Sequence, residues 1–123
     1  NHKKNKSEEK KNSGWIYYRN TIDNDKFYLN EKTIKKDGKF LYFGLLVDSD
    51  TTKVDELNNS YNSHITTNKV DCSTNKIQVE QTILYKKRMG EGSPIRIDTT
   101  KSKFLTLPPE TPIGELVYEF CKN

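Results

Sequence analysis

The chain has 123 residues, a hydrophobic content of 32% and a formal net charge of +4. The length predicts a single domain, and the low apolar content predicts a small core that a covalent cross-link would help to stabilise. Residues 1–13 hold five Lys and two Glu, whereas residues 14–123 hold 16 basic and 15 acidic side chains. The second part is nearly neutral and therefore lacks the basic face of nucleic-acid-binding proteins. No apolar run reaches the roughly 18–20 residues of a membrane-spanning helix.

The first segment, residues 1–13, contains no large apolar side chain. It is predicted to be a flexible polar tail or linker ahead of a single domain at residues 14–123. A cationic tether to an anionic surface is the alternative, but short tails of mixed charge are common at domain edges. The first residue is Asn, as expected of a mature N-terminus after removal of an export signal, or of a sequence cut from a longer one.

Aromatic and β-branched residues predict the first strands. Residues 15–19 (WIYYR) form the first, and residues 27–29 form a short second strand. Residues 33–35 either resume that strand or form a turn of helix.

The most apolar run of the chain, residues 40–47 (FLYFGLLV), is predicted to be a central strand. The preceding Asp37-Gly38 pair favours a type I′ hairpin turn, in which both central residues have positive φ. Gly44 inside the run indicates a bulge or a close backbone approach.

Residues 48–59 are polar and are predicted to be an exposed loop. Their four carboxylates suggest calcium, but the EF-hand spacing, with its central Gly and terminal Glu, is missing. The expectation is therefore a solvated loop, with no metal and no cofactor in the protein. The carboxylates are those of Asp48, Asp50, Asp55 and Glu56.

A hairpin is predicted around Cys72, with a tight polar turn at residues 73–75. Loosely spaced apolar residues between 61 and 72 favour an open edge strand, which would leave the protein a monomer or allow an edge-paired dimer. The strand after the turn alternates strictly, so one of its faces is expected to lie on the core and the other to be largely wet. The first face would carry Ile77, Val79, Gln81, Ile83 and Tyr85, and the second Gln78, Glu80, Thr82, Leu84 and Lys86.

A basic cluster formed by Lys86, Lys87 and Arg88 runs into the Gly-rich residues 89–92. A phosphate-binding loop is conceivable, but the glycines do not match the P-loop or dinucleotide-binding spacing. A turn between strands is predicted instead. Two strand pieces follow, at residues 95–98 and 104–107, around a polar loop.

A C-terminal helix is predicted from its capping and periodicity. Thr111 is suited to the N-cap and Pro112 to the first helical position. Apolar residues recur at i, i+3, i+4 and i+7, which gives one apolar stripe to pack on the sheet. The stripe consists of Ile113, Leu116, Val117 and Phe120. The predicted fold class is α+β: a small antiparallel sheet of about six strands with this helix packed on it.

The two cysteines, Cys72 and Cys121, are predicted to form one disulfide rather than remain free thiols. In the chain-entropy description, closing this loop contributes about 4 kcal/mol. Zinc is disfavoured because there is no CxxC pair. A Cys–His protease would use His64, but nothing marks either cysteine as reactive, so no catalytic residue is assigned. A hydrolase or ligand-binding protein would need His64 or a buried carboxylate in a concave pocket.

The chain resembles the surface-adhesin protein E family of bacterial envelope proteins over about residues 15 to 122. The resemblance lies in the segment FYLNEKTIKKDGKFLYFGLLVD, then VDC, then the strand running into MGEG, then the ending LPPETPIGELVYEFC. Its most specific parts are Asp71-Cys72 and the terminal helix with Cys121. The resemblance implies a small antiparallel sheet, a C-terminal helix across it and a disulfide tying the two together.

The resemblance also implies a function. It implies a non-enzymatic binding module exported to the periplasm, outer membrane or cell surface, and a surface adhesin contacting host or extracellular proteins. The alternative is a periplasmic or envelope accessory domain with a structural role and no host partner. Nucleic acid is not expected as a partner, and membrane attachment would need an upstream anchor. An acidic partner surface would be expected to meet Lys86, Lys87 and Arg88.

Overall fold

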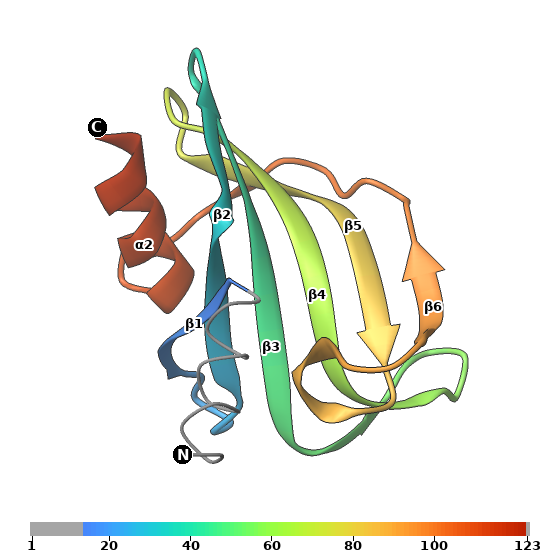
Figure 1. The fold of residues 1–123 in the computed structure, drawn as a ribbon. Coiled ribbons are helices and arrows are strands. Elements are labelled where there is room, and N and C mark those ends of the chain that lie inside the picture. The colour runs from blue at the N-terminus through green and yellow to red at the C-terminus, as the bar shows by residue number, and fades with distance from the viewer. Residues whose placement is uncertain (1–13, 123) are drawn as a thin grey trace.

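The computed structural model describes residues 14–122, and within them one antiparallel sheet dominates (Figure 1). The predicted tail at residues 1–13 lies outside the described residues. The strands are β1 (Trp15–Asn20), β2 (Lys26–Asp37), β3 (Phe40–Val54), β4 (Ser60–Asp71), β5 (Lys76–Tyr85), β6 (Pro94–Asp98) and β7 (Leu105–Thr106). A 3-10 turn, η1 (Arg88–Gly90), follows β5, and the helix α2 (Pro112–Cys121) is the last element of the described residues. The predicted fold class is confirmed.

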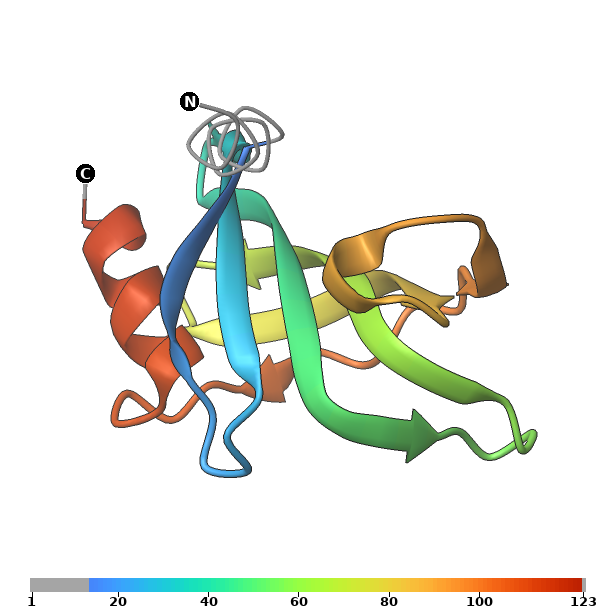
Figure 2. The same ribbon diagram turned by 60° about the horizontal axis from the view of Figure 1, so that its bottom comes forward.

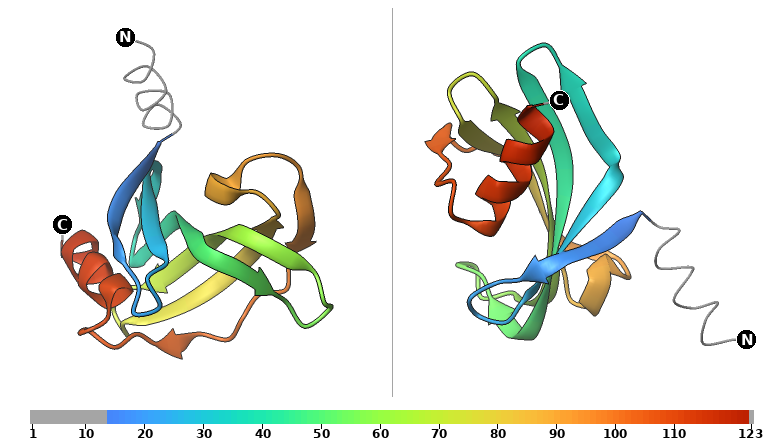
Figure 3. Two further views of the ribbon diagram at one scale, coloured as in Figure 1. Left: turned by 90° about the horizontal axis from the view of Figure 1, so that it is seen from below. Right: turned by 90° about the vertical axis from the view of Figure 1, so that its left-hand side faces the viewer.

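The strands follow one another across the sheet in chain order from β1 to β6, while β7 pairs with the start of β5. The sheet curls, and α2 lies between β1 and the β4–β5 turn (Figures 2 and 3). Arg19 of β1 forms an ion pair with Glu115 of α2, with 2.7 Å between Nη2 and Oε1. Within residues 14–122, no helix has the length and apolarity needed to cross a bilayer.

The main core lies between α2 and the concave side of the sheet. Alternate residues of β3 point towards the helix, as the period of two requires. Leu116 and Val117 of α2 are 5% and 0% exposed, so the predicted apolar stripe is docked. Thr111 caps the helix by accepting a hydrogen bond from Gly114 N, and Pro112 begins it, as predicted. The buried core residues are Leu29, Leu41, Phe43, Leu45, Val70, Leu107, Leu116 and Val117.

The opposite face of β3 is covered at one end by the η1 turn. Leu46 is fully buried there, and a Cβ built on Gly90 would lie 2.9 Å from Ile65 Cδ1 and 3.6 Å from Leu46 Cδ1. Glycine is therefore needed where the turn meets the sheet, since it also has φ +65°. Burial on both faces explains the uninterrupted apolar run in the middle of β3.

The predicted loop at residues 48–59 is largely wrong, because β3 continues to Val54. Asp48 and Ser49 are 4% and 1% exposed, despite their polarity. The turn itself is short, and Asp55 closes it by accepting hydrogen bonds from the N–H groups of Leu57 and Asn59. Composition suggested a loop because polar side chains extend the strand beyond its apolar section.

The face assignment of β5 is correct only up to Val79. Asn68 pairs with Val79 and Thr67 with Gln81, so Glu80 is an extra residue, a β-bulge. Beyond it the two faces exchange. Thr82 and Leu84 therefore share the concave side with Ile77 and Val79, whereas alternation had placed them on the wet face.

Of three smaller predictions, two are wrong and one is confirmed. The segment at residues 61–72 is not an edge, since β4 pairs with β3 and β5; β1 and the β6–β7 side form the edges. The turn at Gly38 is not type I′, because Gly38 has positive φ and Lys39 does not, as in type II′. Gly44 does mark a close approach: its N–H donates to Thr33 Oγ1 at 2.7 Å.

Candidate functional site

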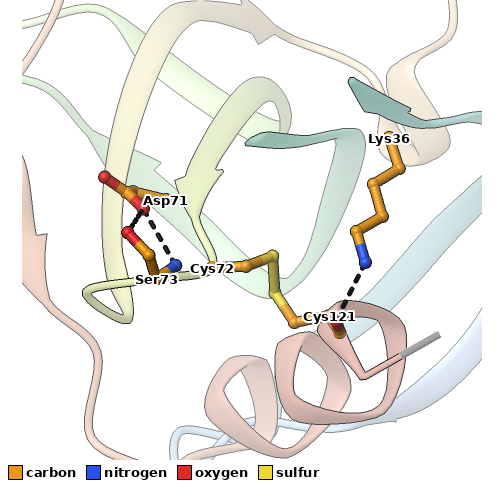
Figure 4. The surroundings of a disulfide bond; sticks show 5 residues. All are labelled: Lys36, Asp71, Cys72, Ser73 and Cys121. Carbon is orange, nitrogen blue, oxygen red and sulfur yellow. Dashed lines mark hydrogen bonds between the residues drawn. A yellow bond between two sulfur atoms is a disulfide. The ribbon is translucent and has the colours of Figure 1, made fainter. Parts of the chain in front are cut away.

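A disulfide joins Cys72, in the β4–β5 turn, to Cys121, the last residue of α2 (Figure 4). The Cα atoms are 5.6 Å apart and the residues are separated by 49 positions. Lys36 Nζ of β2 donates to Cys121 O at 3.0 Å, so β2 also holds the end of the helix. The predicted pairing is confirmed, and the disulfide links the end of the helix to the sheet.

Asp71 stabilises the turn that carries Cys72. Its Oδ1 accepts hydrogen bonds from Ser73 Oγ at 2.6 Å and Ser73 N at 2.9 Å, and Lys39 Nζ lies 3.4 Å from Oδ2. The Ser73 hydroxyl bond, helped by Lys39, outweighs burial and lowers the Asp71 pKa to about 2. The carboxylate therefore stays ionised and keeps the turn in shape at ordinary pH.

The lysine loop (residues 86–90) contains the predicted binding cluster. Arg88 donates from Nε and Nη2 to Asp48 Oδ2 at 2.9 and 2.6 Å, and Met89 N donates to Asp48 Oδ1 at 2.7 Å. Asp48 is a buried carboxylate, and these three donors satisfy it. Hydrogen bonding and electrostatic attraction from Asp48 raise the pKa of Arg88. The positive charge of Arg88 is therefore paired with a carboxylate of the same chain.

The backbone of the lysine loop is fixed from β4. Asn62 Nδ2 donates to Lys86 O and Ser63 Oγ donates to Lys87 O, both at 2.6 Å. Ser63 is itself fully buried. All three predicted residues have exposed side chains, and that of Arg88 is 51% exposed. Arg88 differs from the two lysines because its guanidinium is bonded to Asp48 and anchors the loop.

A second feature is a half-open hollow of about 220 Å³, here called the His64 hollow. It lies on the concave side of the sheet, at the β6 end rather than the α2 end. His64, Leu84 and Arg96 form a row of directly paired residues across β4, β5 and β6. The residues that line the hollow are Asp55, Glu56, Tyr61, His64, Thr82, Leu84, Arg96 and Asp98.

Arg96 is the central charge of the hollow. Its Nη1 lies 2.9 Å from Asp55 Oδ2 and 2.7 Å from Glu56 Oε1, and Nη2 lies 3.7 Å from Asp98 Oδ2. Burial opposes ionisation of Asp55, but hydrogen bonds from Asn59 and Arg96 prevail and lower the pKa to about 2. The guanidinium is therefore surrounded by carboxylates that remain charged.

His64 forms part of the same wall. Its Nδ1 atom is buried and has no hydrogen-bond partner, and its ring lies edge-on to Tyr61 with 6.0 Å between centroids. Burial lowers the pKa of His64 from its ordinary value of 6.5, while the charge of Asp25 acts in the opposite direction. The imidazole is consequently neutral near pH 7.

We expect the wild-type protein to lose stability as the pH falls below about 6.5, the ordinary histidine pKa. The unfolded state binds a proton on His64 in this window and the folded state resists it, so protonation favours unfolding. Urea denaturation between pH 5 and 8 measures the effect, with His64→Gln as the variant that cannot gain the charge. A variant with the same slope against pH as the wild type would contradict this assignment.

The sequence singled out His64 and the carboxylates of residues 48–59, but it did not bring them together with Arg96. Arg96 meets Asp55 only because the β3–β4 turn and β6 approach each other across the curled sheet. A hydrolase or ligand-binding protein is expected to place His64 or a buried carboxylate in a concave pocket, and both His64 and the buried carboxylate of Asp55 line this hollow. Among residues 14–122, no group of three His, Cys, Asp or Glu side chains is placed to hold a metal ion.

Comparison with known proteins gives a family and a fold. Residues 15–122 match the family described as Surface-adhesin protein E. Protein E from non-typeable Haemophilus influenzae has a similar structure, with a TM-score of 0.68 and 20% sequence identity, over 90% of this chain and 77% of that one. A second crystal form of Haemophilus influenzae protein E gives 0.68 and 20% over 90% and 89% of the two chains. No curated protein is significantly similar in sequence.

Proposed function

Because the chain belongs to the surface-adhesin protein E family, we propose that it is a non-enzymatic binding module that contacts host or extracellular proteins. Membership of the family makes it a surface-adhesin-type protein and implies export to the cell surface. The disulfide agrees with an oxidising compartment. We place the domain at the outer face of the envelope, where a host protein can reach it.

The observation that carries the proposal is the construction of the lysine loop. Its backbone is held by Asn62, Ser63 and Asp48, whereas the Lys86 and Lys87 side chains are exposed. A rigid loop loses little conformational entropy on binding, and exposed cations steer an acidic partner towards it. We therefore assign the contact to Lys86 and Lys87, with Arg88 as the residue that holds them in place.

We expect the double variant Lys86→Glu/Lys87→Glu to be retained at least tenfold less than the wild type on immobilised basement-membrane extract and on immobilised serum proteins. Charge reversal turns attraction to an acidic surface into repulsion. The folded protein would be passed over each surface and retention followed by surface plasmon resonance. Wild-type retention should also fall with added salt.

The matched control is Lys76→Glu/Lys103→Glu, which makes the same change of charge at two other exposed lysines. It should be retained like the wild type. Equal loss in both double variants would mean that net charge alone governs retention. A wild-type protein retained on neither surface would favour a structural role in the envelope.

A further inference from the structure

We propose that the His64 hollow binds an aliphatic primary ammonium group, supplied either by a lysine side chain of a partner protein or by a free diamine. This goes beyond the lysine loop, which lies on another part of the sheet and would meet acidic groups. It does not depend on the proposed adhesin function.

The charges around the hollow are unbalanced. Two cations have carboxylate partners: Lys53 Nζ lies 3.4 Å from Asp25 Oδ2, and Arg96 is held by Asp55. The single charge of Arg96 is shared by three lining carboxylates, those of Asp55, Glu56 and Asp98, so the lining of the hollow carries a net charge of −2. The side chains of Glu56 and Asp98 are 71% and 40% exposed, so they form a rim that a ligand can reach. A single ammonium group at this rim would halve this excess of negative charge, and a diamine would neutralise it.

The hollow is unsuited to an anionic ligand. Arg96 is the cation that lines the hollow, and its Nη1 already donates to both Asp55 and Glu56. An incoming carboxylate or phosphate would have to displace these partners and would meet the charge of Asp98. His64 offers no attraction to an anion either, because it is neutral near pH 7.

The shape and polarity of the wall suit an alkyl chain that ends in an ammonium group. Leu84, which is 7% exposed, and Tyr61 both line the hollow and give it apolar and aromatic surface. A volume of about 220 Å³ is below the roughly 300 Å³ at which drug-sized sites begin, so the space suits a single side chain. Methylene groups can lie against Leu84 and Tyr61 while the ammonium reaches Glu56 and Asp98.

The test is an NMR titration of the folded protein with Nα-acetyl-lysine N-methylamide and, separately, with 1,5-diaminopentane. We expect saturable shifts confined to the His64, Thr82 and Leu84 signals. Nα-acetyl-norleucine N-methylamide, which lacks the amine, should give none. Tighter binding of the lysine probe would indicate a protein partner, and tighter binding of the diamine would indicate a free small molecule.

Two variants test separately the charge of the rim and the free volume of the hollow. Glu56→Gln/Asp98→Asn should weaken binding at least tenfold, whereas Glu91→Gln/Glu110→Gln, with the same loss of charge elsewhere, should bind like the wild type. Thr82→Phe keeps every charge and fills the hollow, so it should also abolish the shifts. Each variant is used only if its amide spectrum is that of the folded protein.

The proposal is overturned if neither amine gives saturable shifts, or if the norleucine probe gives the same ones. It is also overturned if folded Thr82→Phe and folded Glu56→Gln/Asp98→Asn both bind like the wild type. These outcomes are independent of the lysine loop, because Lys86→Glu/Lys87→Glu leaves the lining of the hollow unchanged.

Discussion

Replacing Cys72 by Ser is expected to lower the free energy of unfolding by about 4 kcal/mol and the melting temperature by roughly 10–20 °C. The disulfide spans 49 positions, so its loss restores a large conformational freedom to the unfolded chain. Cys121→Ser should have the same effect, because either change breaks the same bond. The double variant should be no less stable than either single variant.

Urea denaturation followed by circular dichroism measures these differences. Reductant should lower the stability of the wild-type protein to that of the variants and leave the variants themselves unchanged. A large effect from one cysteine variant and none from the other would contradict the pairing. Two thiols that react with an alkylating reagent before reduction would contradict it as well.

The second large effect is expected from Leu116→Asp, which should cost several kcal/mol or prevent folding. Leu116 is 5% exposed and packs in the core between α2 and the sheet. A carboxylate there would be buried without a partner, and α2 would have to leave the sheet to hydrate it. The disulfide would still tether the end of the helix, so undocking would be local rather than complete.

The matched control is Tyr118→Asp, which places the same carboxylate on the outer face of the same helix, where the side chain is 63% exposed. It should change stability by less than about 0.5 kcal/mol, as surface changes usually do. Amide hydrogen exchange across α2 separates undocking from global unfolding. A Leu116→Asp protein with wild-type stability and protection would show that the helix does not contribute to the core.

Local signals predicted much of the fold. Thr111 and Pro112 define the start of α2, and the spacing of Leu116 and Val117 identifies its buried side, because capping and periodicity act within one or two turns. The disulfide could also be anticipated, since two cysteines in a chain with a small core have few alternatives. Such features depend on neighbours in sequence and little on the rest of the chain.

Other features depend on contacts between distant residues. Glu80 looks like an ordinary strand residue, yet it is the bulge that exchanges the faces of β5. Without it, Leu84 would point away from His64 and the hollow would lose its apolar wall. Asp48 looked like a loop residue because its partner, Arg88, lies 40 positions away. The alternation of residues along a strand carries no information about the bulge at Glu80 or about the pairing of Asp48 with Arg88.

The way the lysine loop is held has a consequence for its evolution. The fold uses the backbone carbonyls of Lys86 and Lys87 but leaves their side chains in solvent. Substitutions at these two positions therefore change what the loop displays with almost no cost in stability, provided that Asp48 and Arg88 remain. One or two substitutions at these positions can therefore reverse the charge that the loop presents to solvent while its backbone hydrogen bonds stay in place.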